Sequence, residues 1–470
     1  MRKSKLRSDL PNEFSLAPVQ EQSSGGPFFR INDLPVELLI RILTFATQFF
    51  DWDEFTNYES SQRVWNSSPG ATIQKLRRVC QTWKRAIDTT SSIKGVVVIR
   101  RYVLQEQLIK DLNASKKAPL YIYAYTGSFE TSSLADIITP ILLPHLHRIR
   151  TFWEINWGDN SYTRRKSPTL LEIMLKQTNG PLNRLEELVF LSCTPGNTTI
   201  DAPNLSTFIV NPPGDKCVLS VETLSSLYRF SLPTDSLRDT TQGYLGHCRH
   251  LRTLEMAAFH PESAIEDLYP TDIELPLLDT ILFTSSPSST ALRKFFGRIH
   301  APKLRQLTFE GRNDNYDLDA FSASHSLFSH GEATVVQIRL RYITKLDREF
   351  SQSFKPFDGL KTLEIYASDL KSSFFLPLNP GAVVGVLCPQ LIRLVIRNSL
   401  STATPSLVSF ITARMDPTLT SSLGDKPLQI DITEDVLIYS GKGHTHLLKQ
   451  LKKKFPGSVN LKFYWKHSGT

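Results

Sequence analysis

A six-residue pattern of large apolar residues, recurring from residue 185 onward, is the feature that most constrains how this chain folds. Apolar residues fill its first, fourth and sixth positions, as in Leu-x-x-Leu-x-Leu. Successive clear copies begin 20, 22, 24, 27, 26, 56 and 31 residues apart, and a degraded copy at Ala333-Val336-Ile338 divides the interval of 56 into 29 and 27. About nine copies result. The clear copies are Leu185-Leu188-Phe190, Leu205-Phe208-Val210, Leu227-Phe230-Leu232, Leu251-Leu254-Met256, Leu278-Ile281-Phe283, Leu304-Leu307-Phe309, Leu360-Leu363-Ile365 and Leu391-Leu394-Ile396.

Each copy is predicted to form a short strand that turns its apolar residues toward a common core. A single unit of this size cannot bury those residues, so neighbouring units must stack. Unrelated amphipathic strands in an ordinary α/β domain are the alternative. A proline two positions before the first leucine is expected to rigidify the start of the strand in four copies, at Pro203, Pro276, Pro302 and Pro389.

The pattern and its spacing resemble leucine-rich repeats, which form a curved solenoid with a parallel sheet along the inner face. The chain departs from that family at the Asn or Cys expected three positions after the hexad. Only Cys193 fits, while other residues, such as Ser368 and Ser399, stand there in the other copies. The resemblance implies an α/β fold containing an irregular leucine-rich-repeat solenoid with a parallel sheet on its concave face.

The polar residues between the apolar positions are expected to face that concave surface. They carry mixed charge, which suits a protein partner with its own charge pattern. A nucleic-acid backbone would call for a consistently basic stripe instead. The residues predicted to bind the partner are Glu187, Arg252, Glu255, Arg305, Thr308, Lys361, Glu364 and Arg393.

Residues 31–50 are predicted to begin with a helix that is apolar on two sides. Pro35 suits the first turn, and Glu37 favours the positive end of the helix dipole. One stripe, which is expected to pack on the helix carrying Trp83, consists of Val36, Leu39, Ile40 and Leu43. The second stripe, which another protein or the rest of this chain must cover, consists of Leu38, Ile42 and Phe45.

These residues resemble the F-box, the helical module by which many eukaryotic proteins bind the Skp adaptor of cullin–RING ubiquitin ligases. The motif stands here as Leu34-Pro35-x-Glu37-Leu38, then Ile42-Leu43, and later Leu76-x-x-Val79-Cys80-x-x-Trp83. The resemblance assigns Val79 and Trp83 to the core of the module. The residues that it places on the adaptor-facing side are Leu34, Pro35, Leu38 and Ile42.

Two features depart from the F-box pattern. The segment 51–71 is acidic and longer than the usual connection, and the Leu-Trp that often closes the module is replaced by Ser91-Ser92-Ile93. A longer loop adds little closure entropy, so the module can still fold. The loop could nevertheless obstruct the adaptor surface.

The chain is expected to have three parts. Residues 1–30 mix charge with Pro, Ser and Gly and are predicted to be a disordered tail. Residues 31–93 form the F-box-like helical module, and residues 94–470 form the repeat domain. That domain is predicted to begin with a strand–helix–strand unit over 95–125, similar to the segment after the F-box in large fungal F-box families. It ends in a cap made of a strand at 428–432, a helix at 444–455 and a strand at 459–465.

Motifs for catalysis and cofactors are not found. There is no Gly-x-Ser-x-Gly turn, no phosphate-binding P-loop and no His-Glu-x-x-His sequence, so we expect a protein that binds rather than catalyses, without a cofactor. The clusters His145/His147 and His247/Cys248/His250 have no acidic or sulphur partner at ligand spacing, so no metal site is predicted.

The composition of the chain bears on its partners and on its location in the cell. The net charge of +8 comes with basic residues scattered among acids and with no recognition motif, which argues against nucleic acid as a partner. Five widely separated cysteines indicate a reducing compartment. No apolar stretch approaches the length of a membrane span. The expected location is intracellular, cytoplasmic and/or nuclear, without membrane association.

Together the two resemblances imply a substrate-recognition adaptor of a Skp–cullin–F-box ubiquitin ligase. The helical module would bind the Skp-type adaptor and its cullin complex, and the repeats would bind an unknown protein substrate. The alternative is a leucine-rich-repeat protein-interaction scaffold without a ubiquitin role, in which Leu34 and Leu38 are buried within the chain. An enzyme of unrecognised type is the third reading.

Overall fold

One parallel sheet of 14 strands runs through the mixed α/β fold of the computed structural model. Its strands follow chain order, and every neighbouring pair is parallel. The residues that the structure describes are 34–48, 69–100, 105–127, 131–157, 169–178, 180–191, 198–211, 217–232, 241–256, 272–284, 289–311, 317–328, 334–379, 387–399, 403–416, 428–437 and 442–466.

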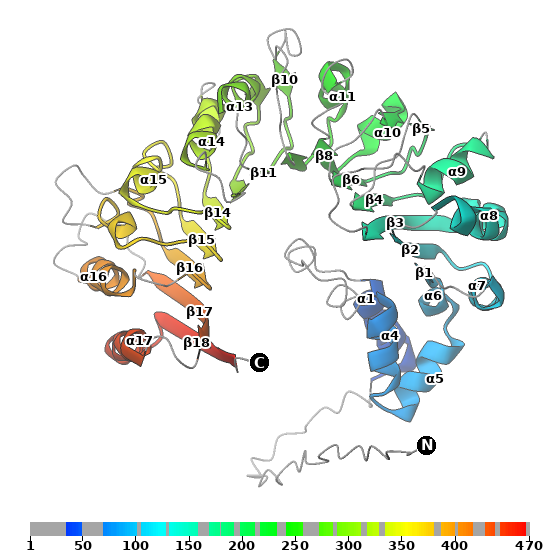
Figure 1. The fold of residues 1–470 in the computed structure, drawn as a ribbon, viewed down its shortest axis with the longest axis horizontal. Coiled ribbons are helices and arrows are strands. Elements are labelled where there is room, and N and C mark those ends of the chain that lie inside the picture. The colour runs from blue at the N-terminus through cyan, green and yellow to red at the C-terminus, as the bar shows by residue number, and fades with distance from the viewer. Residues whose placement is uncertain are drawn as a thin grey trace, which may run out of the picture.

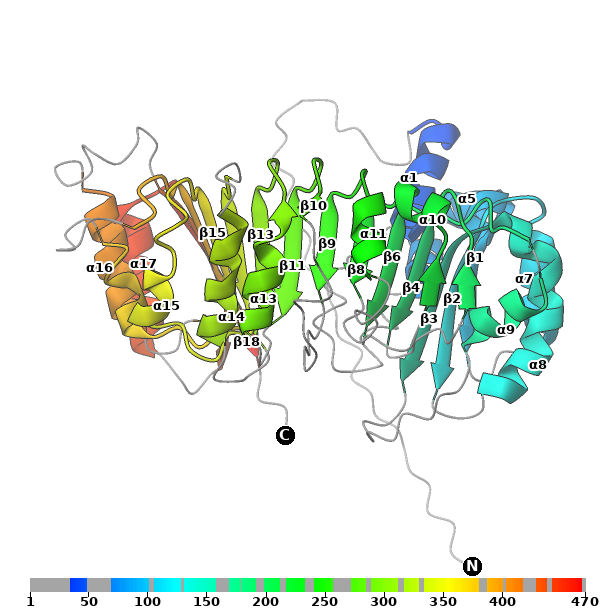
Figure 2. The same cartoon turned by 90° about the horizontal axis from the view of Figure 1, so that it is seen from above.

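The strands follow an arc, with helices along its outer side (Figures 1 and 2). We call the helix-covered side of the sheet the outer face and the opposite side the inner face. The strands of the sheet are β1 (Val96–Arg100), β2 (Leu120–Gly127), β3 (Ile149–Trp157), β4 (Glu187–Leu191), β6 (Thr207–Asn211), β8 (Arg229–Leu232), β9 (Thr253–Met256), β11 (Thr280–Thr284), β13 (Gln306–Glu310), β14 (Gln337–Arg341), β15 (Thr362–Tyr366), β16 (Arg393–Arg397), β17 (Gln429–Leu437) and β18 (Val459–Lys466).

Helices connect these strands across the outer face, as expected for parallel neighbours. Short two-stranded sheets, β5 (Thr198–Ile200) with β7 (Cys217–Leu219) and β10 (Ile273–Glu274) with β12 (Ile299–His300), lie in the same connections. The helices are α7 (Gln105–Ala114), α8 (Thr131–Leu142), η2 (Leu143–Arg148), α9 (Leu170–Lys176), α10 (Val221–Ser226), α11 (Thr241–His247), α13 (Ser289–Phe296), α14 (Asp317–Ala323), η4 (Ser324–Phe328), α15 (Arg348–Gln352), η5 (Ser372–Phe375), α16 (Thr404–Arg414) and α17 (Lys442–Lys454).

The apolar hexads stack in register along this sheet. Leu188 lies opposite Phe208, and the central residues of the following hexads as far as Leu307 likewise lie opposite one another. The degraded copy was placed two residues too early, because Ile338 pairs with Leu307. Its hexad is Val335-Ile338-Leu340, and all three of these side chains are buried. Burial, which sequence spacing did not reveal, therefore fixes the register of this copy.

The proline that recurs before four of the hexads lies in a tight turn. The Leu304 amide donates a hydrogen bond of 3.1 Å to the Ala301 carbonyl, which closes a turn with Pro302 at its second position. Proline suits that position because its ring fixes φ near the value the turn requires. The same closing bond precedes the hexads at Leu205, Leu278 and Leu391, where prolines also stand.

A continuous hydrophobic core lies between the sheet and the outer helices. It extends from Val97 in β1 to Val459 in β18, so the predicted strand–helix–strand unit and the predicted cap share the core of the repeats. Aromatic rings fill its C-terminal half. The ring of Phe321 lies 5.0 to 5.8 Å, centroid to centroid, from four other phenylalanines. These are Phe309, Phe350, Phe354 and Phe357.

The N-terminal helices pack together at the β1 end of the arc (Figure 1). They are α1 (Val36–Gln48), α4 (Pro69–Arg77), α5 (Gln81–Thr89) and α6 (Ser91–Lys94). Their own small core consists of Leu39, Leu43, Trp83, Ala86, Ile87 and Ile93.

Two predictions for this module are wrong. Val79 was assigned to its core but is 56% exposed, because it lies in the break between α4 and α5 rather than on a packed helix face. Val36, which was placed on the packed stripe of α1, is 52% exposed at the first residue of that helix. Trp83 is buried as expected.

Several predicted features lie outside the described residues. These are the tail 1–30, the side chain of Phe45, most of the acidic segment 51–71, and Cys193. Within the described ranges, none of the helices combines the length and the hydropathy that a membrane crossing requires.

Candidate protein-interaction surfaces

The inner face changes character along the arc. Near β1 it is apolar, with a cluster made by side chains of β2 to β6 that alternate with the hexad residues. Trp153 belongs to this cluster, is 1% exposed and packs edge-on against Tyr123 at 5.2 Å. It is therefore a packing residue rather than an exposed anchor. The cluster consists of Tyr123, Trp153, Ile155, Val189, Leu191 and Ile209, all buried.

From β8 onward the inner face is polar and partly open, and four of the predicted partner-binding residues lie on it: Glu255, Thr308, Glu364 and Arg393. Arg393 is exposed and Glu255 is half-buried. Three further predicted residues, Arg252, Arg305 and Lys361, are exposed in the turns directly before β9, β13 and β15. Glu187, also half-buried, lies further back on β4.

Thr308 and Glu364 also lie at inner-face positions of their strands, but they are only 2% and 7% exposed. Neighbouring side chains close over them. They therefore cannot offer the open contact surface that the sequence pattern suggested.

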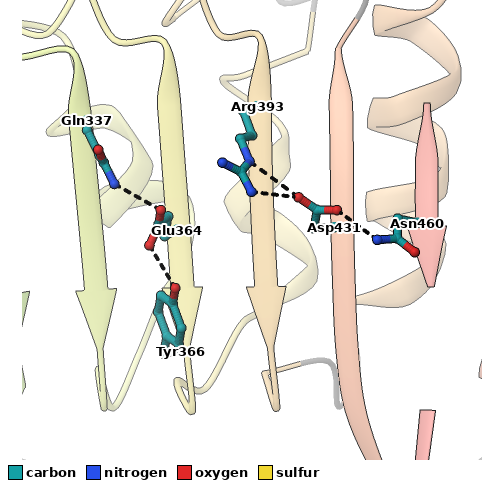
Figure 3. Close-up of polar contacts among 6 residues, drawn as sticks. All are labelled: Gln337, Glu364, Tyr366, Arg393, Asp431 and Asn460. Carbon is teal, nitrogen blue, oxygen red and sulfur yellow. Dashed lines mark hydrogen bonds and ion pairs between the residues drawn. The ribbon is translucent and has the colours of Figure 1, made fainter. Parts of the chain in front are cut away.

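Ion pairs join neighbouring strands across this polar surface. Arg229 Nε lies 2.6 Å from Glu255 Oε1 and Arg339 Nε lies 2.7 Å from Glu364 Oε2. Further along, Arg393 donates to Asp431 at 3.0 Å, and Asn460 donates to the other oxygen of that carboxylate at 3.2 Å (Figure 3).

The arginine is the more exposed partner in each of these pairs. The exposed fractions of the side chains are 25% against 12% for Arg229 and Glu255, 18% against 9% for Arg339 and Glu364, and 52% against 33% for Arg393 and Asp431. The carboxylates thus lie deeper, and the guanidinium groups lie toward the solvent. A guanidinium carries five N–H donors, so one ion pair leaves others available.

Glu364 is the centre of a polar cluster on β14 and β15. Its carboxylate accepts hydrogen bonds from Gln337 Nε2 at 2.9 Å and from the Tyr366 hydroxyl at 2.7 Å (Figure 3). It also accepts one from Arg339 Nε at 2.7 Å. These donors compensate for its burial. Burial of the phenol and its hydrogen bond to Glu364 raise the pKa of Tyr366 to about 12, so the hydroxyl remains a donor at neutral pH.

Three arginines surround the ring of Tyr366. The guanidinium carbons of Arg339, Arg341 and Arg397 lie 5.7, 5.6 and 5.0 Å from the ring centroid, within the range of cation–π attraction. Arg341, Tyr366 and Arg397 are direct neighbours across β14, β15 and β16.

Tyr366, Arg341 and Arg397 were not among the residues predicted from the sequence to bind a partner. Each stands directly after the last apolar residue of its hexad, where inner-face alternation continues for one more residue. Extending the hexad by one position would have found all three.

A second candidate surface lies on α1. Leu38 and Ile42, four residues apart and therefore on one side of the helix, are 45% and 44% exposed. Pro35 is also exposed and Leu34 is half-buried. The neighbouring residues Leu39 and Leu43 are buried in the module core. We call Leu34, Pro35, Leu38 and Ile42 the α1 strip.

Cys248, from the cluster His247/Cys248/His250, packs inside the fold. Cys248 is fully buried, and its thiol donates to the Tyr244 carbonyl at 3.1 Å. Burial raises the pKa of this thiol to about 12. Among the described residues, no group of three or more His, Cys, Asp or Glu side chains could hold a metal ion.

Glu154 is a buried carboxylate on the outer side of β3. It accepts hydrogen bonds from the amides of Leu170 at 2.8 Å and Leu171 at 3.3 Å, at the start of α9. Burial raises its pKa to about 7, although the two amides act in the opposite direction. With 1% exposure, it anchors a helix rather than contacting solvent or a ligand.

Comparison with known proteins supplies no family. No model of a protein family matches the chain, and no curated protein matches it. The geometry of the α1 strip and of the inner face therefore carries the functional inference.

Proposed function

We propose that this chain is an F-box protein with a leucine-rich-repeat solenoid, acting as the substrate-recognition subunit of a Skp–cullin–F-box ubiquitin ligase. One observation carries the proposal. An exposed apolar strip, with Leu38 and Ile42 at its centre, lies on a small helical module that has its own core. That module is joined to a long sheet whose inner face is polar and partly open from β8 onward.

The helical module supports the adaptor role through the separation of its two apolar sides. Leu39 and Leu43 pack with Trp83 inside the module, which leaves Leu38 and Ile42 in solvent. Exposed apolar residues grouped on one helix are typical of a surface that binds another protein. In the alternative reading, a scaffold with no ubiquitin role, this strip would be covered by the chain itself.

The repeat domain supports the leucine-rich-repeat assignment through its register and its turns. The hexads recur every 20 to 31 residues, apart from the gap that the degraded copy fills. They stack in parallel, and the turn before each of the eight clear hexads is closed by the same hydrogen bond. Serine side chains at 368 and 399 bind neighbouring backbone groups at the position where the family has asparagine or cysteine.

The mechanism we propose is positioning. The inner face holds the target while the α1 strip binds the Skp-type adaptor, which brings the target to the cullin-bound transfer machinery. Ubiquitin transfer then accelerates because the effective concentration of the target rises. On this proposal no residue of the chain takes part in the chemical step.

A pull-down of purified components tests the adaptor role. The intact chain is expected to retain a Skp-type adaptor, and the Leu34→Ala/Pro35→Ala and Leu38→Ala/Ile42→Ala variants are expected to lose it. The matched control is Ile109→Ala, which shortens an exposed apolar residue on α7. If the intact chain binds no Skp-type protein, the ubiquitin role is wrong. Equal loss in the Ile109 control would show that the effect is not specific to the strip.

A further inference from the structure

We infer that the C-terminal half of the inner face, from β13 to β18, binds an acidic, carboxylate-rich segment of the partner protein through Arg393 and Arg397. The inference rests on the proposed function only in taking the inner face as the target-binding surface. Its evidence is the arrangement of charge on that surface, which the F-box-like module does not affect.

Charge is sorted by depth among the described ionisable side chains of β15, β16 and β17, whereas Arg341 on β14 is itself buried. Glu364 is 7% exposed and Asp431 is half-buried, whereas Arg393 and Arg397 are exposed. Exposed cations therefore stand over carboxylates that lie below them. The other exposed cations along this half are Arg305 and Lys361, which lie directly before β13 and β15, and Lys462 in β18. A partner approaching this surface meets positive groups first, and a negatively charged segment is its electrostatic complement.

Arg397 is the cation best placed to bind a partner carboxylate. Its neighbours in register are Tyr366 on one side and Thr433 on the other, and neither carries a carboxylate. Within the described part of the chain, Arg397 takes part in no ion pair, in contrast to Arg339 and Arg393. Its guanidinium lies 5.0 Å from the Tyr366 ring centroid. Its N–H donors are thus available for a bidentate carboxylate contact.

The surroundings hold this arginine in place before a partner arrives. The Tyr366 hydroxyl is bound by Glu364 at 2.7 Å, which fixes the ring on which Arg397 rests. A fixed ring limits the conformational entropy that binding would otherwise cost. Arg393 lies four residues earlier on the same strand and is held by Asp431. An extended peptide lying along β16 could therefore reach both guanidinium groups.

Nucleic acid fits this surface less well. A phosphate backbone requires a stripe of cations without intervening acids. The carboxylates of Glu310, Glu364 and Asp431 interrupt the positive charge here. A segment with discrete, spaced carboxylates suits the pattern better.

Peptide binding to the full-length chain tests the inference. The probe is a fluorescein-labelled peptide of about 12 residues with Glu at alternate positions, which an extended chain presents on one face. Its counterpart has Gln at the same positions. We expect the Glu peptide to bind and Arg397→Gln to weaken it about tenfold in fluorescence anisotropy. Lys449→Gln, which removes one exposed charge from α17 on the outer side, is expected to leave binding unchanged.

Thermal unfolding of each variant checks that it is folded, and Arg393→Gln provides a second site on the same strand. Equal weakening by Lys449→Gln and Arg397→Gln would overturn the inference, because only net charge would then matter. Equal binding of the Gln peptide would also overturn it. So would tighter, Arg397-dependent binding of a single-stranded oligonucleotide, which would make nucleic acid the partner. The adaptor pull-down is independent of these outcomes: adaptor retention without peptide binding removes only this inference.

Discussion

The hydroxyl of Ser399 accepts a hydrogen bond of 3.1 Å from the backbone amide of Ser368, one strand away. Ser368 repeats the arrangement with the preceding strand, since its hydroxyl accepts from the Ile343 amide at 3.0 Å. Each hydroxyl also donates to the carbonyl two residues before it in its own chain. Two serines thus link three successive turns at the ends of the strands β14, β15 and β16.

Replacement of Ser399 by alanine is expected to destabilise the fold by about 1 to 3 kcal/mol, because the buried Ser368 amide loses its acceptor. Chemical denaturation followed by circular dichroism measures the change. Ser225→Ala, at an exposed position of α10, is the control and is expected to change stability by less than about 0.5 kcal/mol. Equal stability of both variants would show that the serine links contribute nothing.

Gly311 has no room for a side chain. A Cβ atom there would lie 2.6 Å from the Tyr342 carbonyl oxygen and 2.7 Å from Asp317 Oδ2. Gly311→Ala is therefore expected to lower the free energy of unfolding by about 1 to 3 kcal/mol. Gly246→Ala is the matched control, since nothing lies within 4 Å of its added Cβ and it stands in α11. Alanine there is expected to be neutral or stabilising by up to about 1 kcal/mol.

Replacement by alanine is expected to change the stability of the fold far less at Val79 than at Trp83. Val79 is 56% exposed, so its variant should change stability by less than about 0.5 kcal/mol. Trp83 fills the core of the helical module, so its alanine variant should lower the free energy of unfolding by about 3 to 5 kcal/mol. Limited proteolysis of the module, compared between the two variants, distinguishes them. Equal susceptibility would mean that Val79 belongs to the core after all.

Glu154 is expected to make stability depend on pH. Its pKa is about 7 in the folded chain against 4.5 as an ordinary value, so between these pH values only the folded state holds the proton. The contribution of Glu154 to the free energy of unfolding is therefore complete below pH 4.5 and is lost as the pH rises toward about 7. The loss amounts to roughly 3 kcal/mol in all.

Glu154→Gln should flatten this pH dependence, because glutamine stays neutral throughout. Denaturation at pH 5 and pH 8 provides the measurement. Glu222→Gln, at an exposed position in the first turn of α10, should leave the slope as it is. An unchanged slope in Glu154→Gln would contradict the role assigned to the buried carboxylate.

The apolar pattern was sufficient to predict most strands, because hexad periodicity directly reflects which residues a stacked sheet must bury. It predicted the strands at Leu188 and Leu394, and the prolines before the hexads marked the turns. It failed at residues 333–338, where two alternative alignments are similarly apolar. Only the folded sheet, in which Ile338 pairs with Leu307 and Val335 is buried, separates them. The candidate site was predicted less completely. Arg393 lies exposed on the inner face as expected, but Lys361 lies in the turn before β15, and Tyr366 and Arg397 were missed.

The sequence by itself determined the repeat, the parallel stacking that the repeat requires and the apolar stripes of α1. Only the tertiary structure decided which stripe remains in solvent, because that depends on where α4 and α5 pack against α1. It also decided that Glu364 is buried while Arg397 is exposed, although both alternate with hexad residues. The reason is that exposure on an inner face depends on side chains from neighbouring strands, which are far apart in the chain and meet only in the folded sheet.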